Sequence, residues 1–174
     1  MDTAARFALR PCAVDEFAAI LAIINDGAEA YRGVIPDDRW HDPYMPAAEL
    51  RIQLDAGVAF WGAERAGVLL GVMGLQPVAD VLLIRHAYVA GTAQRSGAGS
   101  ALMAHIRTLA GDRPLLVGTW RAATWAIAFY RKHGFAAVPE ADIAALLNRY
   151  WSIPARQVET SVVLADARWF ARGG

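Results

Sequence analysis

Lysine and cysteine are nearly absent from this sequence, and neither charge is in excess. The 17 basic side chains balance 17 acidic ones, and Lys132 is the only lysine. Because there is no basic excess or basic tract, the charge pattern argues against nucleic acid or an anionic membrane as a partner. Cys12 is the only cysteine and cannot form an internal disulfide, so we expect a reducing compartment.

Long apolar runs are missing as well. The first residues hold no apolar stretch of the roughly 7–15 residues that a signal peptide requires. No run reaches the roughly 18 apolar residues of a membrane-spanning helix. We therefore expect a cytoplasmic protein with no membrane partner. The four histidines show no metal-ligand spacing, so no metal site is predicted.

The chain has 174 residues, and 56% of them are hydrophobic. That length favours one domain over residues 1–174, with a core large enough to fold without disulfides or metals. The high apolar share suits either a large core or a surface buried between two copies. A homodimer is therefore an open alternative.

The spacing of the apolar residues predicts alternating helices and strands. Helices are expected at residues 11–33 and 47–57, from the glycine segment to near residue 111, and at 122–134 and 140–150. Strands are expected at residues 6–10, 58–64, 68–76, 81–89, 113–120, 135–138 and 156–165. This order predicts an α/β (α+β) domain in which helices flank a mixed, mainly antiparallel central sheet.

Residues 93–106, AQRSGAGSALMAHI, place two glycines directly before an apolar run at helical spacing. The start of a helix leaves about four backbone N–H groups without partners and carries the positive end of the helix dipole. Gly97 and Gly99 would let a ligand approach these N–H groups, and Arg95 adds a positive charge. The segment predicts either a phosphate or pyrophosphate site or a plain tight connection, and spacing alone does not decide.

Two common nucleotide-binding motifs do not fit this segment. A phosphate-binding loop of the Walker type needs a lysine after its second glycine, and none follows here. The dinucleotide motif G-x-G-x-x-G needs a third glycine, where this chain has Leu102.

The same residues resemble a known pattern. Residues 94–99, QRSGAG, match the Q/R-x-x-G-x-G/A motif of the GNAT superfamily of N-acetyltransferases. Residues 126–135, AIAFYRKHGF, resemble the second motif of that superfamily, A-x-x-F-Y-x-K-x-G-F. Residues 83–91, LIRHAYVAG, look like the strand that precedes the first motif, and the expected order of elements also fits.

This resemblance implies an enzyme that uses acetyl-coenzyme A, with its pyrophosphate bound by the backbone amides of residues 95–100. It also implies that the backbone of Tyr88 and Val89 pairs with the pantetheine arm, and that the Val89 N–H donates to the thioester oxygen. Relatives often have asparagine where this chain has Ala123, so that contact is either missing or supplied by Thr124. The residues expected to contact acetyl-coenzyme A are Tyr88, Val89, Gln94, Arg95, Ser96, Gly97, Ala98, Gly99, Ser100, Thr124 and Phe129.

The resemblance further implies direct attack of a neutral amine on the thioester, without an acyl-enzyme. Tyr130 matches the tyrosine that protonates the departing thiolate, and packing beside Phe129 is its alternative role. His86 is the candidate base by its reference pKa, although a buried, hydrogen-bonded histidine is favoured over a catalytic one. A water relay to a distant carboxylate is the other route. Arg85 cannot be a base and is expected to bind an acidic substrate or to pair with Glu159.

The aromatic segment 31–46 lies where relatives shape the acceptor pocket. The candidate pocket residues are Tyr31, Trp40, His41, Arg85 and Trp120. The acceptor is expected to be a primary amine of a small molecule or peptide. Two alternatives are a non-catalytic acyl-coenzyme-A sensor with the same fold and an interaction protein that uses its aromatic surface.

Overall fold

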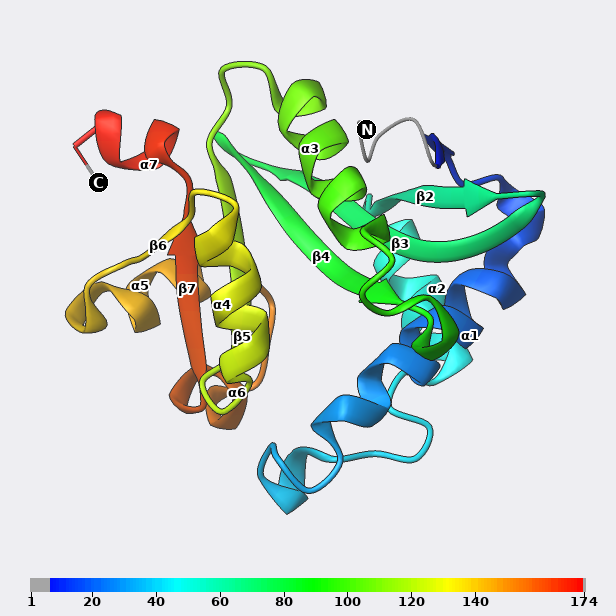
Figure 1. The fold of residues 1–174 in the computed structure, drawn as a ribbon. Coiled ribbons are helices and arrows are strands. Elements are labelled where there is room, and N and C mark those ends of the chain that lie inside the picture. The colour runs from blue at the N-terminus through cyan, green and yellow to red at the C-terminus, as the bar shows by residue number, and fades with distance from the viewer. Residues whose placement is uncertain (1–6, 174) are drawn as a thin grey trace.

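The computed structural model describes residues 7–173, and its strands form one sheet (Figure 1). The strands are β1 (Ala8–Pro11), β2 (Ala59–Arg65), β3 (Val68–Val78), β4 (Val81–Val89), β5 (Leu115–Trp120), β6 (Ala136–Ala137) and β7 (Ser161–Ala165). They are ordered β1-β2-β3-β4-β5-β7-β6 across the sheet. Every neighbouring pair is antiparallel except β4 and β5, which are parallel. The predicted mixed, mainly antiparallel sheet is confirmed.

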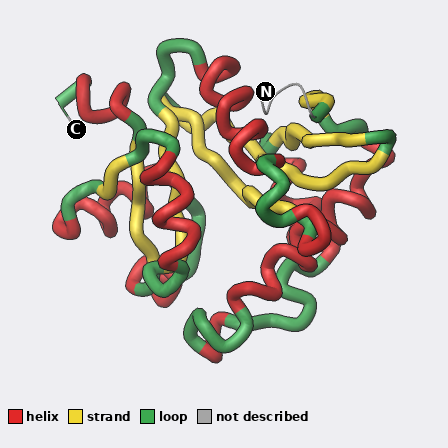
Figure 2. The backbone as a smooth tube through the Cα atoms, in the orientation of Figure 1, coloured by secondary structure: helices red, strands yellow, loops and turns green. Residues whose placement is uncertain are grey.

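Helices cover both faces of this sheet (Figure 2). They are α1 (Phe17–Ala28), α2 (Ala47–Asp55), α3 (Ala98–Ala110), α4 (Thr124–Lys132), α5 (Glu140–Tyr150), α6 (Ala155–Glu159) and α7 (Ala167–Ala171). Among the residues described, no helix is both long and apolar enough to cross a membrane.

Three main groups of buried side chains hold the helices to the sheet. Leu102 and Ile106 of α3 and Tyr130 of α4 pack on one face, against side chains of β3, β4 and β5. On the other face, α1 and α2 pack against β2 and β3, and α5 packs against β5 and β7. The apolar periodicity of α3 explains its orientation, because its fully buried residues recur at three- and four-residue spacing.

Strands β4 and β5 pair over only a short length and then separate (Figure 1). The paired residues are Leu82 with Leu115, Leu83 with Leu116, and Ile84 with Val117. Beyond Ile84, the edge of β4 that faces β5 has no strand beside it. Backbone groups along this edge are therefore available to another molecule, as at any open sheet edge.

The pairing of β4 with β3 contains a bulge, in the part of β4 that has no β5 partner. Val72 of β3 pairs with Tyr88 and Gly74 pairs with Arg85, so two residues of β4 lie opposite Met73 alone. His86 is one of the two and has a φ of +50°. A bulge of this kind breaks the alternation of side chains between the two faces of the strand.

Helix α1 approaches this part of β4 closely because residue 27 is glycine. A Cβ at Gly27 would lie 2.9 Å from Cδ1 of Tyr88 and 3.2 Å from the carbonyl oxygen of Val89. No other residue would fit without moving the helix. The glycine therefore sets the distance between α1 and the unpaired end of β4.

Several predicted boundaries are wrong. Residues 155–159 form α6 instead of the start of a strand, and the last strand covers only Ser161–Ala165. Pro154 is the N-cap residue of this helix, and Val158 is half-buried on one side of it. The predicted helix at 11–33 is α1 flanked by two 3₁₀ turns. Residue 6 of the first predicted strand lies outside the described residues, and α7 was not predicted.

Candidate active site

The glycine segment folds as a turn that leads into α3. Arg95 has a φ of +62° and Gly97 a φ of +93°, and α3 begins at the next residue, Ala98. The left-handed conformation at Gly97 suits a residue without a Cβ. The chain therefore reverses direction immediately before the helix, with its amides on the inside of the turn.

Several backbone N–H groups of this turn have no partner. The Ser96 N–H donates to the Ala93 carbonyl at 3.2 Å, and the Ala98 N–H donates to the Ser96 hydroxyl at 3.3 Å. Within residues 7–173, the amides at 95, 97, 99 and 100 donate to no other group. Unpaired amides at a helix N-terminus bind anions well because the dipole adds to their partial positive charge.

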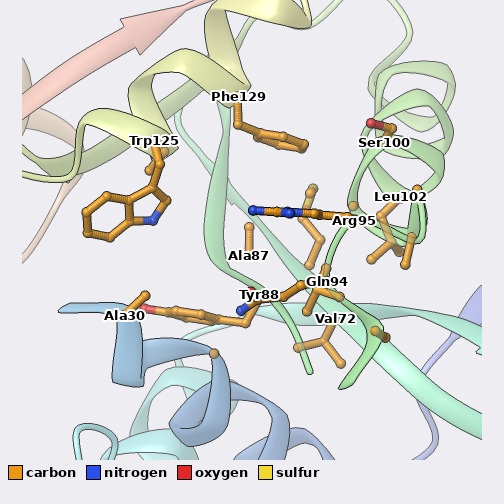
Figure 3. A pocket seen from close by; sticks show the side chains of 18 of the residues that line it. Ala30, Val72, Ala87, Tyr88, Gln94, Arg95, Ser100, Leu102, Trp125 and Phe129 are labelled. Atoms are coloured by element: carbon orange, nitrogen blue, oxygen red, sulfur yellow. The ribbon is translucent and has the colours of Figure 1, made fainter. Parts of the chain in front are cut away.

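A pocket of about 660 Å³ opens in front of this turn (Figure 3). It runs between the turn, the unpaired end of β4 and helix α4. Figure 3 shows the Arg95 side chain extending across it, between the rings of Phe129 and Tyr88. The lining includes Tyr88, Val89, Gln94, Arg95, Gly97, Ala98, Gly99, Ser100, Phe129 and Tyr130.

The pocket brings together most of the residues predicted to contact acetyl-coenzyme A. Ser96 does not line it, because its hydroxyl accepts a hydrogen bond inside the turn. Thr124 does not line it either, since it lies at the first position of α4. Ala123 is fully buried against the group of Ile35 and Trp120.

Sequence reasoning missed some lining residues. Gly27 of α1 and Ala30 of the 3₁₀ turn that follows it form one wall, and Trp125 lies on α4. The sequence gives no local signal for the first two, because they reach the pocket only when α1 packs on β4. Trp125 is one residue before the second motif, and this position could have drawn attention to it.

A second, smaller cavity of about 110 Å³ lies where β4 and β5 separate. Tyr31, Ala87, Tyr88 and Tyr130 line both this cavity and the larger pocket. The remaining lining comes from the segment between α1 and α2, from β4, β5, α5 and β7, and from the chain between α5 and β7. These residues are Tyr44, Ile84, Arg85, His86, Val117, Gly118, Thr119, Trp120, Leu147, Trp151, Ile153, Gln157 and Ser161.

Tyr130 lies at the junction of the two cavities. Tyr130 is only 6% exposed, and its ring packs edge-on against Phe129 and Phe135. Its hydroxyl makes no hydrogen bond within the described residues. Burial raises the pKa of Tyr130, so the phenol stays protonated at neutral pH and can donate a proton.

His86, the candidate base, lines the smaller cavity and not the larger pocket. Its ring stacks on Phe60 with centroids 6.2 Å apart. The expected hydrogen bond is also missing at Nε2, which is buried without a partner. Burial, with the nearby charge of Arg85, lowers the pKa of His86 to about 3, so the imidazole is neutral. The bulge in β4 explains its orientation.

Arg85 does not pair with Glu159, so that prediction is wrong. Its terminal nitrogens donate to Oε1 of Gln76 and Oε1 of Gln53, both at 2.7 Å. Glu159 lies at the end of α6, where it pairs with Arg156. Burial lowers the pKa of Arg85, while the charge of Glu49 opposes that shift.

Only some of the residues of the aromatic segment that were predicted to shape the acceptor pocket line a cavity. Tyr31 and Tyr44 pack together with centroids 5.5 Å apart, and Nε1 of Trp120 donates to the Tyr44 hydroxyl at 3.0 Å. Trp40 lines neither cavity, because its ring packs between Tyr44 and the guanidinium of Arg32. His41 is exposed and also lines neither.

No group of three or more histidine, cysteine or acidic side chains within residues 7–173 is placed to hold a metal ion. The polar groups of the larger pocket include a turn of unpaired amides and the cationic side chains of Arg95 and Lys132. These are groups that bind phosphates. The residues present therefore fit the pyrophosphate of a coenzyme.

Comparison with known proteins agrees with this fold. Residues 56–137 match the family model described as an acetyltransferase (GNAT) domain. The matched segment includes the separating strands, the glycine turn and Tyr130. Over these residues the chain matches a GNAT acetyltransferase domain, and the resemblance found in the sequence is confirmed.

Solved structures share the same fold at low sequence identity. PaiA N-acetyltransferase from Thermoplasma acidophilum, in complex with coenzyme A, superposes with a TM-score of 0.67 at 14% identity, covering 92% of this chain and 98% of that one. Ribosomal-protein-alanine N-acetyltransferase from Brucella melitensis gives 0.63 at 20% identity, covering 91% and 98%. The ribosomal-protein-S18-alanine N-acetyltransferase from Escherichia coli gives 0.61 at 18%, covering 92% of each. No curated protein matches the chain by sequence.

Proposed function

We propose that this protein transfers the acetyl group of acetyl-coenzyme A to a primary amine by direct attack. The observation that carries the proposal is the continuity of the larger pocket. It joins the unpaired amides of the glycine turn to Tyr130 along the open edge of β4. Acetyl-coenzyme A supplies the acetyl group as an activated thioester.

Each part of the pocket has a role in this proposal. The amides at 95, 97, 99 and 100 hold the pyrophosphate, with Arg95 and Lys132 adding positive charge. The open edge of β4 at Tyr88 and Val89 pairs with the pantetheine arm as an added strand would. The Val89 N–H donates to the carbonyl oxygen as negative charge develops there.

Tyr130 supplies the proton for the leaving group. A carbon–nitrogen bond forms as the carbon–sulfur bond breaks, Tyr130 gives its proton to sulfur, and the amine loses a proton to water. That proton returns through water to the Tyr130 phenolate, so the enzyme ends the cycle as it began. His86 is too weak a base for that last step because its pKa lies near 3. The smaller cavity, which also reaches Tyr130, is the place for the acceptor amine.

Two measurements test the proposal. Acetyl-coenzyme A should raise the melting temperature of the protein, whereas NAD and ATP should not. Thiol release from acetyl-coenzyme A should then depend on an added amine. If acetyl-coenzyme A neither binds nor loses its acetyl group with any amine of a broad panel, the proposed function is wrong.

A second candidate is a non-catalytic acyl-coenzyme-A sensor. It is favoured by the neutral His86 and by alanine at position 123, because neither provides a working base or the amide contact of relatives. A sensor would bind acetyl-coenzyme A and release no thiol with any amine. Assembly as a homodimer and a cytoplasmic location stay predictions, which light scattering and cell fractionation can test.

A further inference from the structure

Arg85 is a largely buried cation that forms no ion pair with a carboxylate of the described residues. Its two hydrogen-bond partners, Gln53 and Gln76, are neutral amides. Buried charges in proteins are usually paired, because removal from water is costly without an opposite charge.

The two glutamines fix the position of the guanidinium. Gln53 comes from α2 and Gln76 from β3, and Gln76 itself donates to the carbonyl of Ala56 at 2.9 Å. These bonds use one N–H of each terminal nitrogen, which leaves three of the five guanidinium N–H groups without a partner among residues 7–173. A preplaced guanidinium with unused donors is a receptor for a carboxylate.

The smaller cavity places this cation beside the reaction. Arg85 and Tyr130 both line it, and no aspartate or glutamate does so in the described residues. A cavity with a cation and no acid is a poor site for a substrate whose only charge is positive. It suits an acceptor that carries a negative charge in addition to its amine.

We propose that Arg85 binds the carboxylate of the acceptor, so that the substrate is a small amino acid rather than a simple amine. This inference rests on the proposed acetyl transfer and assigns its substrate class. The carboxylate lies at Arg85, and the amine is directed towards Tyr130. The small volume of the cavity favours a free amino acid over a protein side chain.

Matched pairs of substrates test the inference directly. Each L-amino acid is compared with its α-carboxamide, which keeps the amine and side chain but lacks the negative charge. We expect kcat/KM for thiol release to be roughly tenfold to a hundredfold higher for the acid of the best pair, as for a hydrogen bond to a charged group. Equal rates, or faster reaction of the carboxamide, would overturn the inference and leave acetyl transfer standing.

Variants show whether Arg85 is the group responsible. Arg85→Gln should abolish the preference for the acid, and Arg85→Lys should restore part of it because the charge is kept. Arg51→Gln, on the exposed side of α2, is the matched control and should keep the full preference. An unchanged preference in a folded Arg85→Gln protein, with coenzyme affinity as in the wild type, would also overturn the inference.

A binding measurement separates this inference from the proposed function. If no amine releases thiol, acetyl transfer fails, and the coenzyme-A-loaded protein is then titrated with the same pairs. Stabilisation by an amino acid but not by its carboxamide, lost in Arg85→Gln, would still support a carboxylate site. Stabilisation by neither, or equally by both, would refute it.

Discussion

The two cavities that meet at Tyr130 differ in the groups that form them, which are mainly backbone in one and side chains in the other. The larger pocket depends on backbone amides of one short turn and on the open edge of one strand. The smaller cavity depends on side chains from β4, β5, α5, β7 and the segment after α1. In the proposed function, the first arrangement would bind the pyrophosphate and pantetheine arm of coenzyme A, and the second would bind the acceptor.

This difference predicts separable effects. Changes in the turn should alter coenzyme affinity, changes in the smaller cavity should alter acceptor use, and changes at Tyr130 should alter transfer itself. The following experiments test that separation, from the largest expected effect to the smallest.

Tyr130→Phe removes the proton donor at the junction and keeps the ring. We expect kcat to fall roughly a hundredfold, as for loss of a general acid, while the Kd for coenzyme A changes little. Steady-state kinetics and calorimetry measure the two quantities. Tyr150→Phe is the control, because Tyr150 is equally buried but donates to Asp80 away from both cavities. Normal turnover in Tyr130→Phe would remove Tyr130 from this role.

His86→Gln tests the electrostatics of the smaller cavity. The pKa of His86 is about 3 in the folded protein and about 6.5 when unfolded. Only the unfolded chain gains a proton below about pH 6.5, so the wild type loses about 1.4 kcal/mol for each pH unit from there down to about pH 3. This contribution is fully present above pH 6.5, in the range where the imidazole is neutral in both states.

We therefore expect the free energy of unfolding to fall between pH 7 and pH 5 by about 2 kcal/mol less in His86→Gln than in the wild type. Urea unfolding at the two pH values measures it. His41→Gln, at an exposed position, controls for loss of an imidazole. The same fall in wild type and His86→Gln would show that His86 is not held neutral.

Gly97→Ala tests the turn of the larger pocket. Gly97 and Gly57 have φ values of +93° and +94°, so alanine at either position costs about 1–2 kcal/mol of backbone energy. Only Gly97 lies in the pocket. We expect the Kd for coenzyme A to rise roughly tenfold in Gly97→Ala, from displacement of an amide that binds phosphate, and to stay constant in Gly57→Ala. Equal affinity in both proteins would separate the turn from coenzyme binding.

Gly27→Ala tests the packing of α1 on β4. Alanine favours a helix over glycine by about 1 kcal/mol, but its Cβ would lie 2.9 Å from the Tyr88 ring. Because the neighbours include backbone, we expect overpacking to prevail and the free energy of unfolding to fall by about 1 kcal/mol overall. Ala22→Gly, on the exposed side of α1, measures the helix preference alone. A more stable Gly27→Ala protein would contradict this packing.

The sequence predicted the parts of the molecule that depend on local pattern. The strands expected at 58–64, 68–76 and 81–89 lie within two residues of β2, β3 and β4 at every boundary. The glycine turn was also located, because residues 94–99 resemble a GNAT motif and stand directly before an apolar run at helical spacing. Both results follow from interactions between residues close together in the chain.

The smaller cavity could not be predicted in the same way. The side on which His86 lies could not be derived, because one extra residue in β4 breaks the alternation of its side chains. The partners of Arg85 come from 9 and 32 residues away, and no periodicity marks Gln53 or Gln76 as its neighbours. Trp40 was predicted from its aromatic segment, and it instead holds that segment together.

The three residue pairs that join β4 to β5 are the only strand pairing, within the described residues, between the two halves of the sheet. Leu82 and Ile84 face the group packed under α3, and Leu83 faces the group under α5, so both cores meet at this narrow seam. A change of side-chain volume here would rotate the two halves of the sheet against each other. The width of both cavities would then change together. A substitution at this seam would therefore not reshape the smaller cavity without also reshaping the larger pocket.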